Sequence, residues 1–438
     1  MIAGSILGCC HSHVSTSPWI VNLLNKKLFR NTFLYMLTEA INKAVPFLLL
    51  PIMTTYLAPS DYGIIATFSA FTGILAIFVH VNMVGAVNVG FFKLERSQLK
   101  RYISNVLFIS GISATICLLF LFFYNKKFIF LLGIDKKWVF IAVIFVLSQF
   151  ITNINLVLWQ AEQKAKFFCI FQALQTLSYI SITLYFIIYI GLKWEGQILA
   201  QIMSAALYSL ASFIIITRRN YFYLDINKNY IKDILRFGLP LIPHALSAWF
   251  RTGVDRFLLN AFVGISATGL YAMGYQFGSI IGILAASFNQ AYSPYLFNKL
   301  NSIDIQGKKQ LVKYTYLYFI VILLIACFFS YFFPIFVNRF INIRYHEANQ
   351  YIPWIAFGFA FQGMYFMVVN YIFYVKKTHY LSIATFCSGL IHVASSYILI
   401  QINGAIGAAQ ATTFSFFIAF VFVWILSAKA YKMPWRLS

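Results

Sequence analysis

Acidic residues are scarce in this sequence. Only 11 of its 438 residues are Asp or Glu, and charged residues of both signs make up 10% of the chain. Soluble domains are about 25% charged, whereas here 61% of the residues are hydrophobic. The shortage of charge excludes an ordinary soluble domain and predicts an integral membrane protein.

Long polar segments are missing as well. Apolar stretches follow one another with short loops between them, and each approaches the roughly 20 residues that cross a bilayer core about 30 Å thick. Uninterrupted runs favour helices, because barrel strands would alternate over about ten residues. We therefore predict an all-α polytopic membrane protein with twelve transmembrane helices, at 32–57, 63–90, 102–124, 138–158, 167–190, 196–217, 238–262, 266–290, 313–337, 351–374, 381–400 and 405–427.

Motifs for catalysis and cofactor binding are also lacking. The six cysteines show neither metal-ligand spacing nor a disulfide framework; they are Cys9, Cys10, Cys117, Cys169, Cys327 and Cys387. The sequence has no nucleotide-binding loop, no Cys/His cluster and no glycosidase-like pair of acids. We expect no cofactor and no metal, and we expect neither an enzyme nor a chain that drives transport with ATP by itself.

Basic residues are abundant, and the net charge is +22. If the N-terminus is cytoplasmic, the 33 Lys and Arg residues divide into 23 inside, 7 outside and 3 within helices. This asymmetry follows the positive-inside rule and predicts that both termini are cytoplasmic. One loop departs from this rule, because the alternation of spans places it outside although it carries four lysines, Lys126, Lys127, Lys136 and Lys137. Membrane topology therefore accounts for the basicity, and we expect no nucleic-acid partner.

The chain divides into two halves of six predicted helices each. The segment 56–66 resembles 262–272, with Gly63 aligned to Gly269 and Ala66 to Ala272. This match favours a parallel internal repeat, whose lobes enclose a site between them. The predicted divisions are an unstructured extension at 1–20, an N-terminal lobe at 21–217, a cytoplasmic linker at 218–237, a C-terminal lobe at 238–430 and a cytoplasmic tail at 431–438.

Charged residues lie near the middle of the first helix of each half. The first helix carries Glu39 and Lys43, and the seventh carries Arg251, Asp255 and Arg256. A charge at mid-bilayer costs roughly 2.5–3.5 kcal/mol on insertion scales, so we interpret these residues as lining a polar cavity between the lobes. The alternative is that each pair is an internal salt bridge that only holds helices together.

Helical spacing refines this site. Residues four and seven apart share a face, which places His244 on one stripe with Arg251 and Asp255 and predicts that Arg251 and Asp255 reach each other. We assign substrate binding to Arg251, Arg256 and Lys43, and charge pairing or coupling to Asp255, Glu39 and His244. For His244, a hydrogen-bonded wall residue is the alternative. The single histidines His80 and His392 are interpreted as structural.

Several segments carry a family resemblance. The blocks Arg236–Trp249, Gly253–Leu259 and Gly269–Tyr275 look like the seventh and eighth helices of Wzx-type polysaccharide flippases, and Leu48–Ile52 and Leu57–Gly63 look like the family's first helices. The resemblance covers residues 21–430. It implies two six-helix lobes with the fold of multidrug and toxic-compound exporters and the lipid II flippase, and alternating access between them.

The resemblance also implies a substrate class. Such flippases move an undecaprenyl-diphosphate-linked oligosaccharide, as in O-antigen and lipopolysaccharide biosynthesis, across the bacterial inner membrane. Membrane lipids and other polysaccharide-assembly proteins are the further partners it implies. Two alternatives stay open: a cation or drug exporter of the same superfamily, and a polytopic polymerase or ligase. The latter would be expected to have a large external loop, which is absent here.

Overall fold

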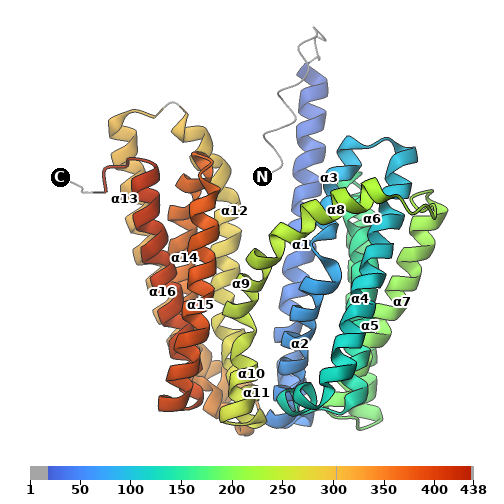
Figure 1. The fold of residues 1–438 in the computed structure, drawn as a ribbon. Coiled ribbons are helices and arrows are strands. Elements are labelled where there is room, and N and C mark those ends of the chain that lie inside the picture. Colours follow the sequence, from blue (N-terminus) through green and yellow to red (C-terminus); the bar gives the residue numbers. More distant parts are fainter. Residues whose placement is uncertain (1–17, 302, 436–438) are drawn as a thin grey trace.

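The computed structural model describes residues 18–301 and 303–435, and within these ranges every regular element is a helix. Figure 1 shows two helical bundles side by side, with the first helices in one and the last in the other. Most of the predicted extension, 1–17, lies outside the described residues. The first helix, α1, begins at Pro18, inside the range predicted to be unstructured.

The N-terminal lobe contains the first seven α-helices. One predicted span, 63–90, is two helices, because Val81 and Asn82 both adopt left-handed backbone conformations and end the first of them. The elements are α1 (Pro18–Tyr56), α2 (Pro59–His80), α3 (Met83–Lys93), α4 (Arg96–Leu132), α5 (Lys136–Ala161), α6 (Ala165–Leu184), the π-helix η1 (Tyr185–Tyr189) and α7 (Trp194–Arg218).

A linker and the C-terminal lobe follow. They comprise α8 (Lys228–Gly238), the 3₁₀ turn η2 (Leu239–Leu241), α9 (Ile242–Thr252), α10 (Val254–Phe262), α11 (Ile265–Gly278), α12 (Ile280–Leu300), α13 (Ile305–Phe340), the 3₁₀ segment η3 (Ile343–Gln350), α14 (Ile352–Tyr374), α15 (Thr378–Asn403) and α16 (Ala405–Ala430). The segment 218–237 is therefore not a plain loop, since α8 occupies its second half.

Eleven described helical segments are long and apolar enough to cross a membrane. All twelve predicted spans are helical, but 238–262 is built from pieces of 3, 11 and 9 residues, so it is not among the eleven. The multi-pass helical architecture is confirmed. The count of twelve is not established, because the span 238–262 is not one continuous helix long enough to cross a membrane.

Each lobe has its own apolar interior. One large cluster of buried side chains fills the C-terminal lobe, and several smaller clusters fill the N-terminal lobe. The most extensive contact between the lobes joins α2 and α11. In Figure 1 the two bundles are closest at the end that carries α10 and α11 and diverge toward the opposite end. The lobes thus meet at one end of the molecule.

The first helix contacts both lobes. Its Asn42 donates to Gln172 Oε1 at 3.3 Å and accepts from Thr176 at 2.9 Å, which binds α1 to α6. One turn later the ring of Phe47 lies 6.2 Å from that of Phe277 on α11. Pro46 lies between these contacts, and a proline removes one backbone donor from the helix.

Candidate functional site

The candidate site is organised by a break in the seventh predicted span. At Gly253 the backbone has φ −117° and ψ −35°, away from regular α-helical values, and the helix divides into α9 and α10. A Cβ at this position would lie 2.5 Å from the indole Nε1 of Trp249, which itself donates to the Ala70 carbonyl at 2.8 Å. Only glycine fits beneath this indole.

The break separates two residues that the sequence predicts to pair. Arg251 lies in the last turn of α9 and Asp255 in the first turn of α10, and in the described part of the chain no ion pair joins them. The prediction that Arg251 and Asp255 form a pair is therefore wrong. It assumed one continuous helix through Gly253, and the changed backbone directs Asp255 toward another helix.

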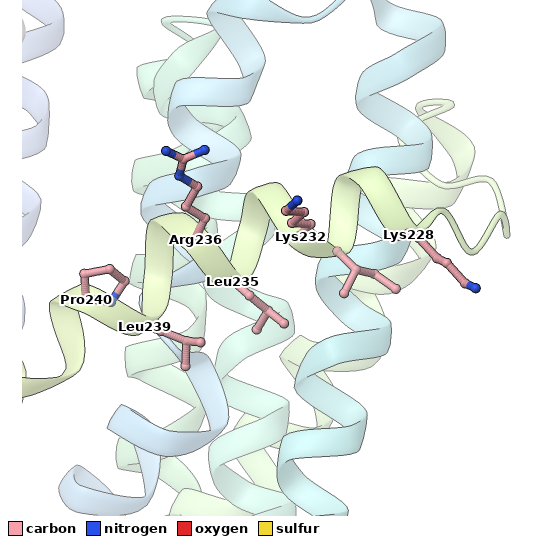
Figure 2. Close-up of a pocket in the computed structure, with 7 residues that line it drawn as sticks. Lys228, Lys232, Leu235, Arg236, Leu239 and Pro240 are labelled. Atoms are coloured by element: carbon pink, nitrogen blue, oxygen red, sulfur yellow. The ribbon is translucent and has the colours of Figure 1, made fainter.

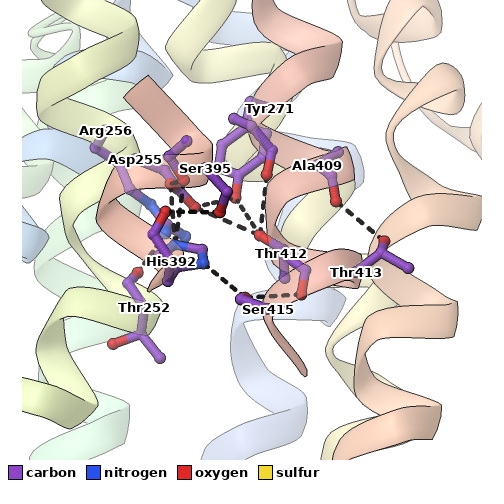
Figure 3. Close-up of polar contacts among 12 residues, drawn as sticks. Thr252, Asp255, Arg256, Tyr271, His392, Ser395, Ala409, Thr412, Thr413 and Ser415 are labelled. Atoms are coloured by element: carbon purple, nitrogen blue, oxygen red, sulfur yellow. Dashed lines mark hydrogen bonds and ion pairs between the residues drawn. The ribbon is translucent and has the colours of Figure 1, made fainter. Parts of the chain in front are cut away.

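Asp255 is fully buried and has four polar neighbours. One carboxylate oxygen accepts from Ser396 at 2.7 Å and lies 3.1 Å from His392 Nε2. The other accepts from the Tyr271 hydroxyl at 2.7 Å and lies 3.5 Å from the Thr412 hydroxyl. These partners come from α11, α15 and α16, and Figure 3 shows them converging on the carboxylate. The network ties α10 to the C-terminal lobe.

The sequence predicts a structural role for His392, and in the structure both of its ring nitrogens have hydrogen-bond partners. Its Nδ1 lies 2.8 Å from Ser415 Oγ, which is also 3.1 Å from the Thr412 carbonyl. A hydroxyl has one hydrogen. If the Ser415 hydroxyl donates to the Thr412 carbonyl, it can only accept from Nδ1 of His392. With Nε2 donating to Asp255 as well, both ring nitrogens then carry a hydrogen. If Ser415 donates to Nδ1, the ring is neutral. The network accommodates both protonation states.

Arg256 is also buried and remains inside the C-terminal lobe. Its guanidinium donates to the Thr252 carbonyl and lies 4.3 Å from the ring centre of Tyr275 and 5.4 Å from that of Tyr271. Cation–π contacts of this kind stabilise a guanidinium that has left water. Arg256 is thus largely satisfied by its own lobe.

Arg251 is the less satisfied arginine. Its Nε is buried and has no hydrogen-bond partner among the described residues. The phenols of Tyr365 on α14 and Tyr275 on α11 lie near the guanidinium. Tyr275 also faces Arg256, so two cations and two phenols share one region. This region can accept an anion with oxygen ligands, because a guanidinium donates readily to phosphate.

The remaining predicted site residues are dispersed. Glu39 and Lys43 form an ion pair of 3.6 Å within α1, and 61% and 52% of their side chains are exposed. The pair therefore does not hold two helices together. His244 is exposed near the start of α9. His80 bonds the Val146 carbonyl at 3.1 Å within its own lobe, in agreement with a structural role.

A second ionic cluster lies in the connections of the N-terminal lobe. Glu162 follows α5 and pairs with Lys164 at 3.0 Å and Arg96 at 3.8 Å, and also with Arg219 after α7. Tyr221 donates to Glu162, and the Arg96 guanidinium lies 3.2 Å above the Tyr221 ring. Burial alone would raise the pKa of Glu162, but the Tyr221 and Lys164 hydrogen bonds and the charge of Arg219 lower it below the ordinary 4.5. This cluster joins three connections of one lobe.

The fold and this geometry can be set beside known proteins. The sequence profile of the family described as "Polysaccharide biosynthesis protein" matches residues 28–299, more than half of the chain. The chain belongs to this family. The family resemblance noted in the sequence is confirmed. The solved structures that resemble it are those of transporters and of a flippase rather than of enzymes.

Two relatives come from Haemophilus influenzae. This polysaccharide biosynthesis protein is 24% identical over 379 residues to "Lsg locus putative protein 1", an alignment that covers 84% of the chain and 90% of the relative. It is 25% identical over 383 residues to an "Uncharacterized membrane protein", with 84% and 89% covered. The similarity extends over nearly the whole length of both relatives.

Solved structures share the fold. An inward-facing multidrug resistance MATE family transporter of the MOP superfamily matches with a TM-score of 0.70 at 15% identity, over 88% of this chain and 94% of that one. Lipid II flippase MurJ in an inward closed conformation matches with a TM-score of 0.70 at 14% identity, over 91% and 87%. The predicted MATE/flippase-like fold is confirmed.

The hydrogen-bond partners of Asp255 on α15 and α16 were not predicted from the sequence. His392 and Ser396 are four residues apart on α15, and Thr412 and Ser415 are three apart on α16. Such spacings place polar groups on one face of each apolar helix. This signal was present in the sequence, but nothing in it joined these helices to α10, more than 130 residues earlier.

Proposed function

We propose that this protein is a flippase for a lipid-linked oligosaccharide. Its substrate is an undecaprenyl-diphosphate-linked repeat unit of O-antigen or a similar surface polysaccharide. The protein moves this unit from the cytoplasmic to the periplasmic leaflet of the bacterial inner membrane by alternating access, with both termini in the cytoplasm. Membership of a polysaccharide biosynthesis family and a fold shared with a lipid II flippase support this proposal.

The proposal rests mainly on Arg251, whose buried Nε has no hydrogen-bond partner among the described residues. A buried guanidinium nitrogen without a protein partner is costly, because a polar group taken from water needs a hydrogen bond. A diphosphate oxygen would supply that bond, and hydrogen bonds to charged groups contribute roughly 1.5–3 kcal/mol. Tyr275 and Tyr365 add hydroxyl donors beside it. Arg256 and Lys43 are proposed as secondary substrate contacts, with Glu39 and His244 as charge partner and coupling group.

The position of Asp255 changes the expected mechanism. Because its carboxylate is held by His392, Ser396 and Tyr271, it does not compete with phosphate for Arg251. We assign it instead to holding α10 against α15 and α16. The same contacts disfavour a cation exporter, since this buried acid is already saturated with donors and offers little to a cationic substrate.

Complementation of a strain that lacks the protein tests the proposal. Arg251→Ala should abolish surface polysaccharide at a normal protein level, and Arg251→Lys should retain a fraction, because it keeps the charge but loses the two-pronged geometry. Arg339→Ala, at an exposed end of α13, is the matched loss of one cation and should complement fully. Full export by both Arg251→Ala and Arg251→Gln would overturn the assignment.

A further inference from the structure

The linker helix α8 is amphipathic and has an open face. On its inner side, Ile234 is fully buried and Asp233 accepts from the Tyr102 hydroxyl at 3.0 Å. Gly238 lies against Val81, where a Cβ would overlap the Val81 carbonyl. These contacts seat α8 on α3 and α4. In Figure 1, α8 runs across the ends of the N-terminal bundle rather than along it.

The opposite side of α8 combines cations with apolar side chains. Lys228, Lys232 and Arg236 recur every four residues and are exposed. Together with Ile231, Leu235, Leu239 and Pro240 they line an open groove of about 650 Å³. Figure 2 shows Arg236 on one side of the helix ribbon, and Leu235 and Leu239 on the other. A helix of this composition lies flat in a membrane interface, with its apolar side toward the acyl chains and its cations toward the headgroups.

The connection that precedes α8 continues this surface. Leu224 and Ile226 are 74% and 56% exposed, and both stand next to the basic helix in the sequence. Exposed aliphatic side chains beside cations are costly in water and suit the boundary between headgroups and acyl chains. Helix and connection together therefore form one amphipathic surface, Leu224 to Pro240.

We propose that this surface binds the anionic phospholipids of the cytoplasmic leaflet. The spacing of the three cations favours several phospholipid headgroups over the single transported diphosphate as the ligand of this surface. Residues eight apart on a helix are separated by about 12 Å, so Lys228, Lys232 and Arg236 are spread along the helix and are not gathered around one point. They can contact separate headgroups of a charged leaflet. This inference is independent of the transported substrate.

Binding of lipid here has a mechanical consequence. The helix α8 runs through the short turn η2 directly into α9, which ends at Arg251 and Thr252. A lipid-bound α8 fixes the start of the C-terminal lobe's first helix at the membrane surface. The amount of anionic lipid in the leaflet therefore affects where the first helix of the C-terminal lobe is held while the lobes move.

Energy transfer between a dye and labelled lipids tests the proposal. The full-length protein, free of its own cysteines, carries Asn229→Cys with a donor dye and is placed in phosphatidylcholine nanodiscs with a trace of acceptor-labelled phosphatidylglycerol or phosphatidylcholine. Phosphatidylglycerol should be enriched near the dye, by roughly fivefold for each contributing cation. High salt should reduce the enrichment, because screening weakens surface attraction.

Charge variants separate α8 from the rest of the protein. Lys228→Glu with Lys232→Glu and Arg236→Glu should remove the enrichment, and the corresponding glutamine variant should remove most of it without reversing charge. The matched control reverses Lys308, Lys309 and Lys313 at the start of α13 and should keep it. Equal transfer from both lipids in the unmodified protein, or an equal loss in the control, would overturn the proposal. Excess free diphosphate in the buffer should reduce the enrichment no more than a simple salt of the same ionic strength does.

Discussion

Gly63 of α2 and Gly269 of α11 lie against each other where the two lobes meet. A Cβ on Gly63 would overlap the Ile265 carbonyl, and a Cβ on Gly269 would overlap the Pro59 carbonyl, so the contact is nearly symmetric. The two glycines are also the positions that align in the internal repeat. Small residues allow such close helix approach in membranes. The repeat thus places a self-complementary crossing at the lobe interface.

Enlarging either glycine should loosen this interface. In Gly63→Ala and Gly269→Ala the added Cβ has no room, so the backbone of the facing helix must move away. Overpacking of this kind costs about 1–3 kcal/mol. We expect a lower thermal unfolding temperature and faster modification of a cysteine placed at Tyr62. Gly111→Ala on α4 is the control, since its Cβ would meet nothing within 4 Å; a destabilisation equal to that of Gly63→Ala would contradict the prediction.

The internal repeat and the helical architecture could be predicted from the sequence because both depend on local pattern. Apolar length marks a span, and the Gly63–Gly269 alignment needs only eleven neighbouring residues of each half. The break at Gly253 could not be predicted in this way. It depends on the indole of Trp249 lying over the glycine, held by the Ala70 carbonyl of the other lobe. That contact is tertiary, and it decides which way Asp255 faces.

The buried pair of Asp255 and His392 should couple strongly in a double-mutant cycle. His392→Ala removes a hydrogen-bond partner from a buried carboxylate, and losing a hydrogen bond to a charged group costs roughly 1.5–3 kcal/mol. Asp255→Asn with His392→Ala should recover part of this, because the amide at 255 carries no charge to be left without a partner. Thermal unfolding in detergent measures all variants. His80→Gln, which loses one bond to a carbonyl, should cost clearly less, and additive single effects would show that no pair exists.

The Glu162 cluster predicts an acid-sensitive contribution to stability. Its folded pKa lies below the ordinary 4.5, so the carboxylate stabilises the fold fully above that value. The contribution is lost as the pH falls through the lowered folded pKa. Glu162→Gln should therefore reduce stability at neutral pH, by roughly 1.5–3 kcal/mol for a hydrogen bond to a charged group. Unfolding scans should show the difference from wild type shrinking in acid, whereas a constant difference would argue against a titrating role.

Cysteine labelling in intact cells tests the topology. The predicted division of 23 basic residues inside and 7 outside puts Lys228 on the cytoplasmic side and Asp135 on the outer side, as an expectation. A membrane-impermeant reagent should modify Asp135→Cys and spare Lys228→Cys until the cells are opened. Both positions are exposed at helix starts, so access through the protein itself is comparable. Labelling of Lys228→Cys in intact cells would reverse the predicted orientation.

The ion pair of Glu39 and Lys43 stands apart from these interactions because both charges belong to one helix. A contact within a helix has the same energy wherever that helix moves, and an equilibrium between two states responds only to energies that differ between them. The pair therefore travels with α1 as a neutral unit. In the proposed alternating-access cycle, it lowers the cost of placing charge in the membrane without favouring either arrangement of the lobes.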